Sequence, residues 1–464
     1  MTSSGISAVM GRMSGRILEL MQQHGIPGVS LAVVHDQELA WAKGFGFADL
    51  ASARPMHEDT LFGVASITKT FTAGAIMQLH EQGKLSLADS IVCYVPEFSE
   101  VKSRFCPIDQ ITIRRLMTHR SGLVGEGSTG HWRTLEFPSM ADILDDLRRV
   151  EIVIEPDSAF KYCNLAFALL GEIVARVSGI PYREYIVNKI LVPLQMTSSG
   201  FDRNHQSRSR TATGYMAHGY DDAPEISPDP ELRGYDAAGG LRSSVLDLAK
   251  WVSLQFRTEA KERASADVLN EKSLREMHRV TDLEPDWRVG YAMPWFATRI
   301  GDNIYLQHSG SVPGFLSMLA FSKPDRVGVI ALSNVQGQIG IGAIAFETIE
   351  ELVKEIRGHV RESETPAPTP EEYRPLLGRY YSSRLWGVVV HVEFRNNQLL
   401  LVIPPDPFML PTPAATLKAT GARGEFIVQE GRIAGEPLRF QFGPDGTVIG
   451  FILGEGGTEY TRRS

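Results

Sequence analysis

Apolar residues near the start of the chain fall in two short runs that predict a β-hairpin. The runs cover residues 29–35 and 39–47, and His35-Asp36-Gln37 separates them. Two such runs around a short polar turn are typical of antiparallel strands. The polar segment before them, residues 12–24, has helical spacing, so we expect a helix there.

Helical periodicity dominates the middle of the chain, and strand-like runs return later. Residues 66–82 predict an apolar helix that ends at Gly83. Further helices are expected at residues 112–119, 140–149, 165–177, 182–191, 244–256 and 342–357, and strands at 304–308, 315–321 and 327–332. Because strands lie at both ends of this segment, we expect one α+β unit whose sheet pairs the two ends.

A second pattern begins after residue 371. Residues 359–371 are charged and rich in proline, which is typical of a linker. Short alternating runs with turn signals follow, for example residues 388–394 and 447–453. They predict a small antiparallel barrel or sandwich. The domains expected are therefore 1–358, the linker 359–371, and a C-terminal domain 372–464.

Composition excludes several classes of protein. The chain has 464 residues, of which 43% are hydrophobic, which is enough for two or three domains. Its net charge of −8 argues against nucleic-acid and anionic-membrane partners. The three cysteines are too scattered for a disulfide framework, and no apolar run reaches the length of a membrane span. We therefore expect a cytoplasmic protein with free thiols.

Motifs for metals and cofactors are missing from the sequence. There is no H-E-x-x-H, C-x-x-C, calcium loop or phosphate-binding glycine loop. His80-Glu81 begins like a zinc motif, but Lys84 stands where the second histidine would be. We predict no metal and no cofactor.

The candidate chemistry starts at Ser66-Ile67-Thr68-Lys69, where the helix of residues 66–82 begins. Residues three apart share a helix face, so the Lys69 ammonium is expected beside the Ser66 hydroxyl. The S-x-x-K pattern alone is weak, because it also occurs at Ser99/Lys102 and Ser158/Lys161. A lone serine at a helix start is more often a cap, and a lone lysine there is more often solvated.

Two further groups of residues single out Ser66. Tyr162-x-Asn164 occurs once, just before a predicted helix, and His308-Ser309-Gly310 ends a predicted strand. Each alone has an ordinary interpretation, as a turn before a helix or as a histidine at a strand end. In this order and spacing, the three motifs resemble those of the penicillin-binding-protein-like serine hydrolases. The branch most similar contains class C β-lactamases, family VIII esterases and D-amino-acid-specific peptidases.

Two other stretches carry the same resemblance, residues 116–123 and 238–244, and the likeness covers residues 15–355. It implies an antiparallel sheet flanked by helices, with a helical subdomain. The tail from residue 372 is similar to the lipocalin-like barrel of some peptidase members. The C-terminal domain is therefore expected to be such a barrel.

The resemblance also implies roles for the residues. Ser66 would be the nucleophile, and Lys69 and Tyr162 together would move its proton. Either could be the base: Lys69 if burial leaves it partly neutral, or Tyr162 if Lys69 and a protonated His308 lower its pKa. Asn164, His308, Ser309 and Gly310 would bind substrate. Backbone N–H groups of Ser66 and Ser311 would form an oxyanion hole.

One departure from the family pattern narrows the substrate. β-Lactamases and transpeptidases usually carry lysine where this chain has His308. Histidine is shorter than lysine and titrates near neutrality, so it is expected to bind a substrate carboxylate more weakly than lysine does. The expected reaction is therefore hydrolysis of small peptide or amide bonds, D-amino-acid-containing ones among them. A carboxylesterase with at most weak β-lactamase activity is the alternative.

A third interpretation is that the protein is not an enzyme. It would then be a catalytically silent domain that binds peptidoglycan fragments, or a barrel that carries an apolar ligand. Intact Lys69 and Tyr162 speak against it, because proton transfer is the function that obviously requires both. The expected partner is a small-molecule or short-peptide substrate, with neither nucleic acid nor membrane. Homo-oligomerisation stays open.

Overall fold

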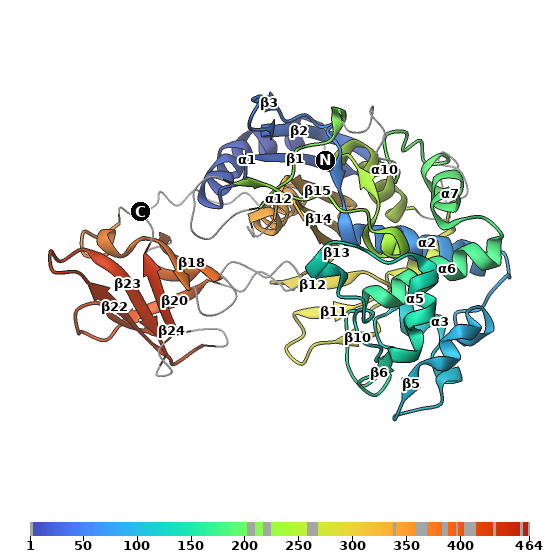
Figure 1. Ribbon diagram of the computed structural model, residues 1–464. Coiled ribbons are helices and arrows are strands. Elements are labelled where there is room, and N and C mark those ends of the chain that lie inside the picture. Colours follow the sequence, from blue (N-terminus) through green and yellow to red (C-terminus); the bar gives the residue numbers. More distant parts are fainter. Residues whose placement is uncertain are drawn as a thin grey trace. The chain divides into compact units, whose positions relative to one another are not determined.

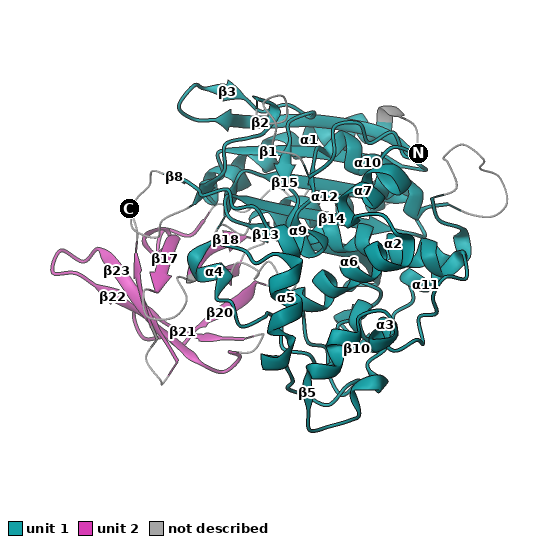
Figure 2. Ribbon diagram, turned by 45° about the vertical axis from the view of Figure 1, so that its right-hand side comes forward, with its two compact units in different colours: residues 1–217, 223–359 teal, residues 218–222, 360–464 magenta. Residues whose placement is uncertain are grey.

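The computed structural model describes residues 3–201, 209–216, 224–257, 268–336, 340–358, 369–382, 388–395, 398–402, 414–429, 433–454 and 458–462. These divide into two compact units, one within residues 1–359 and one within residues 360–464 (Figure 2). The boundaries expected from the sequence, 1–358, 359–371 and 372–464, stay a prediction. Most of the predicted linker, residues 359–368, lies outside the described residues.

The first unit is built on an antiparallel sheet, which within the described residues has nine strands in the order β10-β11-β12-β13-β14-β15-β1-β2-β3 (Figure 1). Strand β1 pairs with both β2 and β15, so the sheet joins the two ends of the unit, as the sequence predicted. The bounds are β1 Gly28–His35, β2 Glu38–Asp49, β3 Arg54–Pro55, β10 Asp282–Leu283, β11 Val289–Tyr291, β12 Phe296–Ile300, β13 Asn303–Val312, β14 Phe315–Ser322 and β15 Val327–Ser333.

The predicted hairpin of β1 and β2 is confirmed. Its turn residues Asp36 and Gln37 have positive φ angles of 49° and 73°. Two residues with positive φ are what a tight hairpin turn of the twisted sheet requires. The edge strands β10, β11 and β12 were not anticipated, because they are too short for a clear alternating pattern.

Helices cover both faces of this sheet. In β1, Leu31 and Val33 face one hydrophobic cluster, with α1 and α12, while Ala32 and Val34 face the other. This alternation follows from the two-residue period of a strand. Because both faces are buried, β1 is almost continuously apolar. The first cluster is formed with α1 Ser3–Gln23, which begins nine residues before the predicted helix, and α12 Gly340–Ile356.

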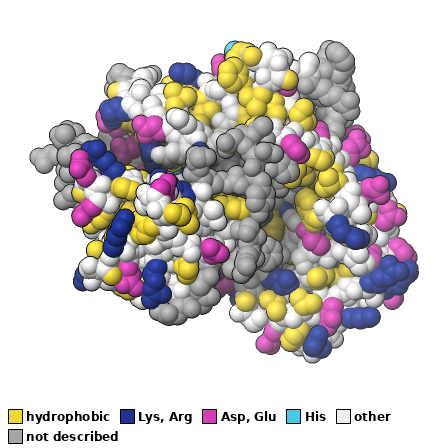
Figure 3. Space-filling model, turned by 60° about the vertical axis from the view of Figure 1, so that its left-hand side comes forward, with side chains coloured by type: hydrophobic (Ala, Val, Ile, Leu, Met, Phe, Trp, Pro, Cys, Tyr) yellow, Lys and Arg dark blue, Asp and Glu magenta, His cyan; other side chains and the backbone are white. Residues whose placement is uncertain are grey.

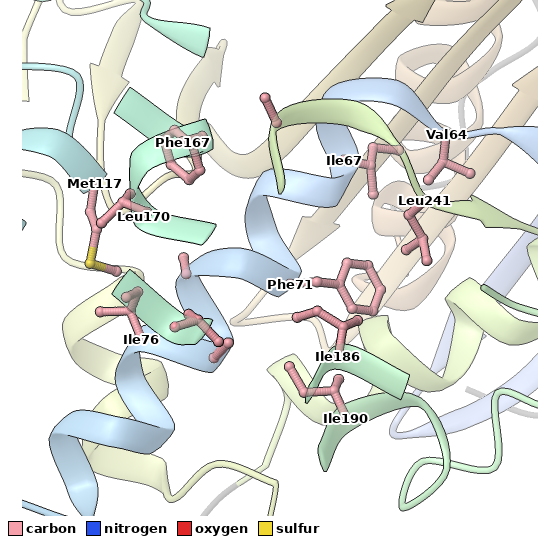
Figure 4. Packing of buried hydrophobic residues seen from close by; sticks show 14 of the residues in the cluster. Val64, Ile67, Phe71, Ile76, Met117, Phe167, Leu170, Ile186, Ile190 and Leu241 are labelled. Atoms are coloured by element: carbon pink, nitrogen blue, oxygen red, sulfur yellow. The ribbon is translucent and has the colours of Figure 1, made fainter. Parts of the chain in front are cut away.

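The opposite face carries the helical part of the unit. Its helices are α2 Thr68–Glu81, α3 Ile113–Met117, α4 His131–Thr134, α5 Met140–Asp146, α6 Asn164–Ser178, α7 Tyr182–Ile186, α9 Asp236–Gly239, α10 Val245–Gln255 and α11 Glu271–Met277. Side chains from α2, α3, α6 and the segment after α7 meet around α2 (Figure 4). Phe71 of α2 stacks on Trp251 of α10 with ring centroids 4.2 Å apart. α2 is therefore a central helix that is buried from Thr68 to Leu79.

Short elements complete the first unit. A π-helical turn, Val187–Leu191, follows α7, and 3-10 turns are Ala65–Ile67, Ile91–Cys93, Pro96–Glu100, Ile108–Gln110, Leu147–Arg149 and Arg233–Tyr235. Small sheets pair β4 Phe62–Gly63 with β9 Arg242–Ser243, β5 Lys102–Ser103 with β6 Glu151–Ile152, and β16 Val335–Gln336 with β7 Tyr215–Met216 and β8 Glu225–Ile226. Strand β4 ends three residues before Ser66, the candidate nucleophile.

The second unit confirms the predicted barrel. Among its described residues eight antiparallel strands close on themselves, because β17 pairs with both β18 and β24. The strands are β17 Gly378–Ser382, β18 Val388–Arg395, β19 Gln398–Val402, β20 Ala415–Ala419, β21 Glu425–Val428, β22 Pro437–Phe442, β23 Val448–Leu453 and β24 Thr458–Arg462, after a 3-10 turn at Arg374–Leu376. Tyr380, Phe440 and Phe451 pack inside it. The barrel therefore has a core of its own.

Among the described side chains on the face drawn in Figure 3, neither the acidic nor the basic ones form a large patch of a single charge. Acidic and basic side chains are interspersed there among hydrophobic ones. Along the described part of the chain, no single helix has the length and apolar composition to cross a membrane. One helix pair, Asn164–Ser178 and Tyr182–Leu191, meets these criteria only when combined, and it is bent by 77°.

Candidate active site

Ser66 lies in the 3-10 turn Ala65–Ile67, one turn before α2, and not in the first turn of the helix itself. The residue before it, Ala65, has a positive φ of 49°, a conformation that costs free energy for a residue with a Cβ. The turn is held on its N-terminal side, where Val64 N donates to Leu241 O at 3.0 Å. Ser66 is therefore fixed at a sharp corner, with 8% of its surface exposed.

Lys69 is fully buried beside Ser66. Its Nζ donates hydrogen bonds to Ser66 Oγ at 3.0 Å, to Asn164 Oδ1 at 2.7 Å and to the carbonyl oxygen of Ala238 at 2.7 Å. Burial disfavours the ammonium and lowers the pKa of Lys69 to about 7. A substantial share of Lys69 side chains is therefore neutral near pH 7.

Tyr162 contacts both Ser66 and Lys69. Its ring centroid lies 4.8 Å from Lys69 Nζ, and a hydrogen bond joins its side chain to that of Ser66. Burial raises the pKa of Tyr162 well above its ordinary value, and the hydrogen bond with Ser66 offsets only part of this rise. Its ring stacks on that of His119, at 4.5 Å between centroids. Tyr162 therefore carries its proton at neutral pH.

Asn164 is the first residue of α6, and its side chain lies between two charged groups. Cys163 caps the helix, because its Sγ accepts from Ala166 N at 3.1 Å. Burial also raises the pKa of the Cys163 thiol to about 12, which fits a packing residue and not a nucleophile. Asn164 Nδ2 donates to Glu126 Oε1 at 2.5 Å. The cap fixes the start of α6, and with it Asn164, whose Oδ1 accepts from Lys69 Nζ.

Strand β13 brings His308, Ser309 and Gly310 to the same turn. A Cβ on Gly310 would come within 2.4 Å of both Val64 O and Ser317 Oγ, so only glycine allows the strand to approach so closely. Ser317, opposite Gly310 on β14, donates its Oγ–H to Val64 O at 2.9 Å. The strand is thereby tied to the residues just before Ser66.

The surroundings of His308 favour its neutral form, which bears on the alternative in which a protonated His308 helps to lower the pKa of Tyr162. Burial and the neighbouring Lys69 lower the pKa of His308 to about 3. Its Nδ1–H donates to Ser309 O at 2.7 Å, which leaves Nε2 as the acceptor. His308 therefore cannot supply the positive charge that would have made Tyr162 a base.

The other two S-x-x-K sequences have no such surroundings. Ser99 lies in an exposed 3-10 turn and Lys102 is an exposed residue of β5. The Ser158 hydroxyl is exposed and donates to Glu155 O at 2.6 Å, as in an ordinary turn. The contacts of Ser66 with Lys69 and Tyr162 therefore distinguish it from these two serines, in agreement with the motifs that singled it out in the sequence.

Three contributors to the site were missed in the sequence. Glu126 bonds Asn164, the carbonyl of Ala238 accepts from Lys69, and His119 stacks on Tyr162. His119 and Ala238 lie in the two stretches that carried the additional family resemblance, and Glu126 follows the first of them by three residues. The resemblance therefore indicated the segments. It could not indicate the roles, because a backbone carbonyl acceptor and a stacking ring do not require a recognisable sequence motif.

The family assignment rests on a sequence profile of the Beta-lactamase family, which matches residues 14–354. The chain belongs to this family. Its 28% identity to "Protein flp" from Staphylococcus aureus (strain MRSA252) extends over 356 residues, 76% of this chain and 67% of the relative. It is also 29% identical over 332 residues to the "Putative penicillin-binding protein PbpX" of Bacillus subtilis (strain 168), covering 71% of this chain and 76% of that one.

A solved structure extends the likeness to both units. The structure described as that of "the octameric penicillin-binding protein homologue from Pyrococcus abyssi" has a TM-score of 0.67 and 26% sequence identity. The match covers 97% of this chain and 100% of the other. The β-lactamase/transpeptidase-like fold is thus confirmed. Family and site together support a serine hydrolase acting on amide or ester bonds.

Among the described residues, no three His, Cys, Asp or Glu side chains are grouped so as to hold a metal ion. Near the site, the Glu126 carboxylate contacts His131 Nε2 through one oxygen and accepts from Asn164 Nδ2 through the other.

Proposed function

We propose that this protein hydrolyses small peptide or amide bonds, D-amino-acid-containing ones among them, through an acyl-enzyme on Ser66. The observation that carries the proposal is the hydrogen bond of 3.0 Å between the buried Nζ of Lys69 and Ser66 Oγ. A hydroxyl becomes a useful nucleophile when a neighbouring base accepts its proton. A lysine whose pKa is lowered to about 7 is such a base at neutral pH.

The first half of the reaction forms the acyl-enzyme. Ser66 Oγ attacks the substrate carbonyl carbon while its proton passes to neutral Lys69. The N–H groups of Ser66 and Ser311 stabilise the negative charge on the carbonyl oxygen, and one such donor is typically worth about 10²–10³ in rate. The carbon–nitrogen or carbon–oxygen bond then breaks, and the proton is returned to the leaving group.

Tyr162 acts in this scheme as a neutral phenol. Its raised pKa makes a resting tyrosinate unfavourable, and the neutral His308 does not help to form one. Because its side chain contacts both Ser66 and Lys69, it passes the proton from the ammonium of Lys69 to the departing group. In the second half, Lys69 and Tyr162 activate a water that attacks the ester carbon and frees Ser66.

The neutral His308 supports a substrate without a carboxylate at this position. A cation would be needed to hold such a group firmly, and His308 offers one N–H, already used by Ser309 O, and one acceptor nitrogen. This argues for neutral amides and esters over β-lactam antibiotics. A carboxylesterase with at most weak β-lactamase activity is the second candidate, because the same machinery cleaves esters.

The decisive experiment is Ser66→Ala. Turnover of aminoacyl anilides and short acyl esters should fall at least about 10⁴-fold, as for other lost nucleophiles. A fluorophosphonate should label the unsubstituted protein once per chain, at Ser66, and leave the variant unlabelled. Full turnover by Ser66→Ala would refute the proposal. A panel of D- and L-aminoacyl anilides and esters separates the peptidase from the esterase.

The non-enzymatic alternative predicts a different result. A silent binder of peptidoglycan fragments or lipophiles would turn over no member of this panel. Mass spectrometry would then find a bound lipid or peptide in the purified protein.

We also propose that the chain forms a homo-oligomer. The octameric assembly named for the Pyrococcus abyssi homologue supports this, because the match covers 97% of this chain. Light scattering of the full chain should give a mass several times 51.3 kDa. A mass of one chain at all concentrations would contradict the proposal.

A further inference from the structure

A single side chain connects the candidate base to a carboxylate. Lys69 Nζ donates to Asn164 Oδ1 at 2.7 Å, and Asn164 Nδ2 donates to Glu126 Oε1 at 2.5 Å. The amide of Asn164 cannot be turned round, because its oxygen would then face a carboxylate and its NH₂ an ammonium. The ammonium of Lys69 and the carboxylate of Glu126 are thus two hydrogen bonds apart, with their polarities aligned.

Glu126 is held in place from its other side. Its Oε2 lies 3.2 Å from His131 Nε2, and His131 Nδ1 lies 2.7 Å from Thr129 Oγ1. The His131 ring is 1% exposed and packs on the ring of Tyr235, at 4.5 Å between centroids. The Glu126 side chain, 30% exposed, is therefore a fixed part of the site and not a mobile surface group.

The other titratable groups that face Lys69 in the described part of the chain are neutral near pH 7. Burial keeps Tyr162 and Cys163 protonated by raising the pKa of each. It keeps His119 and His308 unprotonated by lowering the pKa of each. On the side of α9, Lys69 meets the carbonyl of Ala238, and the neighbouring Asp236 pairs with Arg183 instead.

Two further titratable groups lie near Glu126, and each is bound to neighbours of its own. Tyr235, whose OH accepts from Gly127 N, stays protonated because burial raises its pKa, and Asp146 receives hydrogen bonds from Ser128. The carboxylate of Glu126 is thus the ionic group that stabilises the protonated form of Lys69.

We propose that Glu126 is a positioning residue which, through Asn164, sets the protonation equilibrium of Lys69 and with it the pH range of the enzyme. This inference rests on the proposed function of Ser66 and Lys69. Burial alone would leave Lys69 neutral over most of the physiological range, but an amine that is always neutral is a weak acid and returns its proton poorly to a leaving group. The anionic Glu126 opposes the effect of burial, so that Lys69 can both accept and return the proton.

The test is Glu126→Gln, which removes the charge and keeps the hydrogen bonds. The new amide oxygen can accept from Asn164 Nδ2, and its NH₂ can donate to His131 Nε2. The acid limb of kcat/KM for a neutral ester should move to lower pH by about one unit, since a nearby opposite charge typically shifts a pKa by about 1–3 units. The pH dependence of fluorophosphonate labelling of Ser66 should move by the same amount.

Controls separate charge from structure. Glu126→Asp keeps the charge and should leave the acid limb close to its original pH. Glu151→Gln removes a carboxylate whose side chain pairs with the exposed Arg104 and not with Asn164 or Lys69, and it should leave the limb unchanged. Should Glu126→Gln not fold, as judged by circular dichroism, Glu126→Met is the second uncharged variant.

Two results would overturn the inference. One is an acid limb that stays at the same pH in a folded, uncharged variant. The other is an unmoved limb with a higher KM only for substrates that carry a free ammonium, which would make Glu126 a substrate contact instead. Failure of the proposed function looks different, because turnover and labelling would then survive Ser66→Ala.

Discussion

Lys69 shows how burial changes the chemistry of a single residue. An exposed lysine at this position would be an ammonium at every physiological pH. Here Nζ is surrounded by Ser66, Asn164 and the Ala238 carbonyl, with the rings of Tyr162 and Phe167 4.8 and 5.7 Å away. Hydrogen bonds stabilise the amine in either protonation state, while removal from water disfavours the charge. The balance leaves a base that is half neutral near pH 7.

This balance predicts the pH dependence of the reaction. Because the pKa of Lys69 is lowered to about 7, the reactive neutral form is lost as the pH falls through that value. We expect kcat/KM for a neutral ester to be level above pH 8 and to fall about tenfold per unit below pH 6. Rates measured between pH 5 and 9 check this. An acid limb near pH 10, the pKa of an ordinary lysine, would contradict it, and Lys69→Arg should be inactive throughout.

A second prediction at the level of a single residue concerns His308 and the choice of substrate. Because it is neutral, a chromogenic cephalosporin with a carboxylate should be a poorer substrate than a neutral ester. His308→Lys should raise the ratio of the two kcat/KM values about tenfold or more, since a hydrogen bond to a charged group contributes about 1.5–3 kcal/mol. The ratio cancels any loss of folded protein. An unchanged ratio would show that this position does not face the substrate carboxylate.

At the scale of elements, the site depends on the contact of β13 with the turn before α2. Ser66 and Lys69 come from one local segment, whereas His308, Ser309 and Gly310 come from a strand more than two hundred residues later. Gly310 is the point of closest approach, with no room for a Cβ against Val64 O. Ser317 of β14 adds a hydrogen bond to the same carbonyl. The strand is therefore held in register with the nucleophile.

Gly310→Ala should separate these two elements. Its Cβ would lie 2.4 Å from Val64 O, a backbone atom that can move only with the whole turn. We expect a loss of about 1–3 kcal/mol in the free energy of unfolding, as for other overpacked positions, and a lower kcat. Gly342→Ala in α12 is the matched control, because its nearest atom, Met318 Cε, is 3.7 Å away. Denaturant unfolding should find the control unchanged or stabilised by up to about 1 kcal/mol.

At the scale of the whole molecule, the two units have separate hydrophobic cores. The two clusters of the first unit extend from Ile6 to Val353, and the cluster of the barrel extends from Leu376 to Tyr460. The groups assembled around Ser66 all belong to the first unit. Each unit therefore has the apolar burial that a domain needs in order to fold by itself.

We accordingly predict that a chain of residues 1–358 folds without the barrel. It should give a cooperative thermal transition by circular dichroism, and a fluorophosphonate should label its Ser66 as in the full chain. The full-length protein, measured in parallel, is the control. An aggregated or unlabelled fragment would show that the barrel is needed to complete the fold.

Much of the fold could be predicted because it depends on local patterns. The hairpin of β1 and β2, the buried helix α2 and the alternating strands of the barrel each follow from spacing and turn residues in one short stretch. Elements with too few residues to show a period were missed, among them β10, β11 and α9. The order and spacing of Ser66, Tyr162 and His308 were also readable, since a motif needs only residue types and positions.

The sequence by itself determined the identity of the reactive groups: a serine with a lysine one turn away, a tyrosine, an asparagine and a histidine. Their protonation states were decided only by the tertiary structure. Burial makes Lys69 a base near neutrality, keeps the proton on Tyr162 and removes it from His308. The physical reason is that the cost of a charge depends on the water and dipoles around it, and these come from segments far apart in the chain.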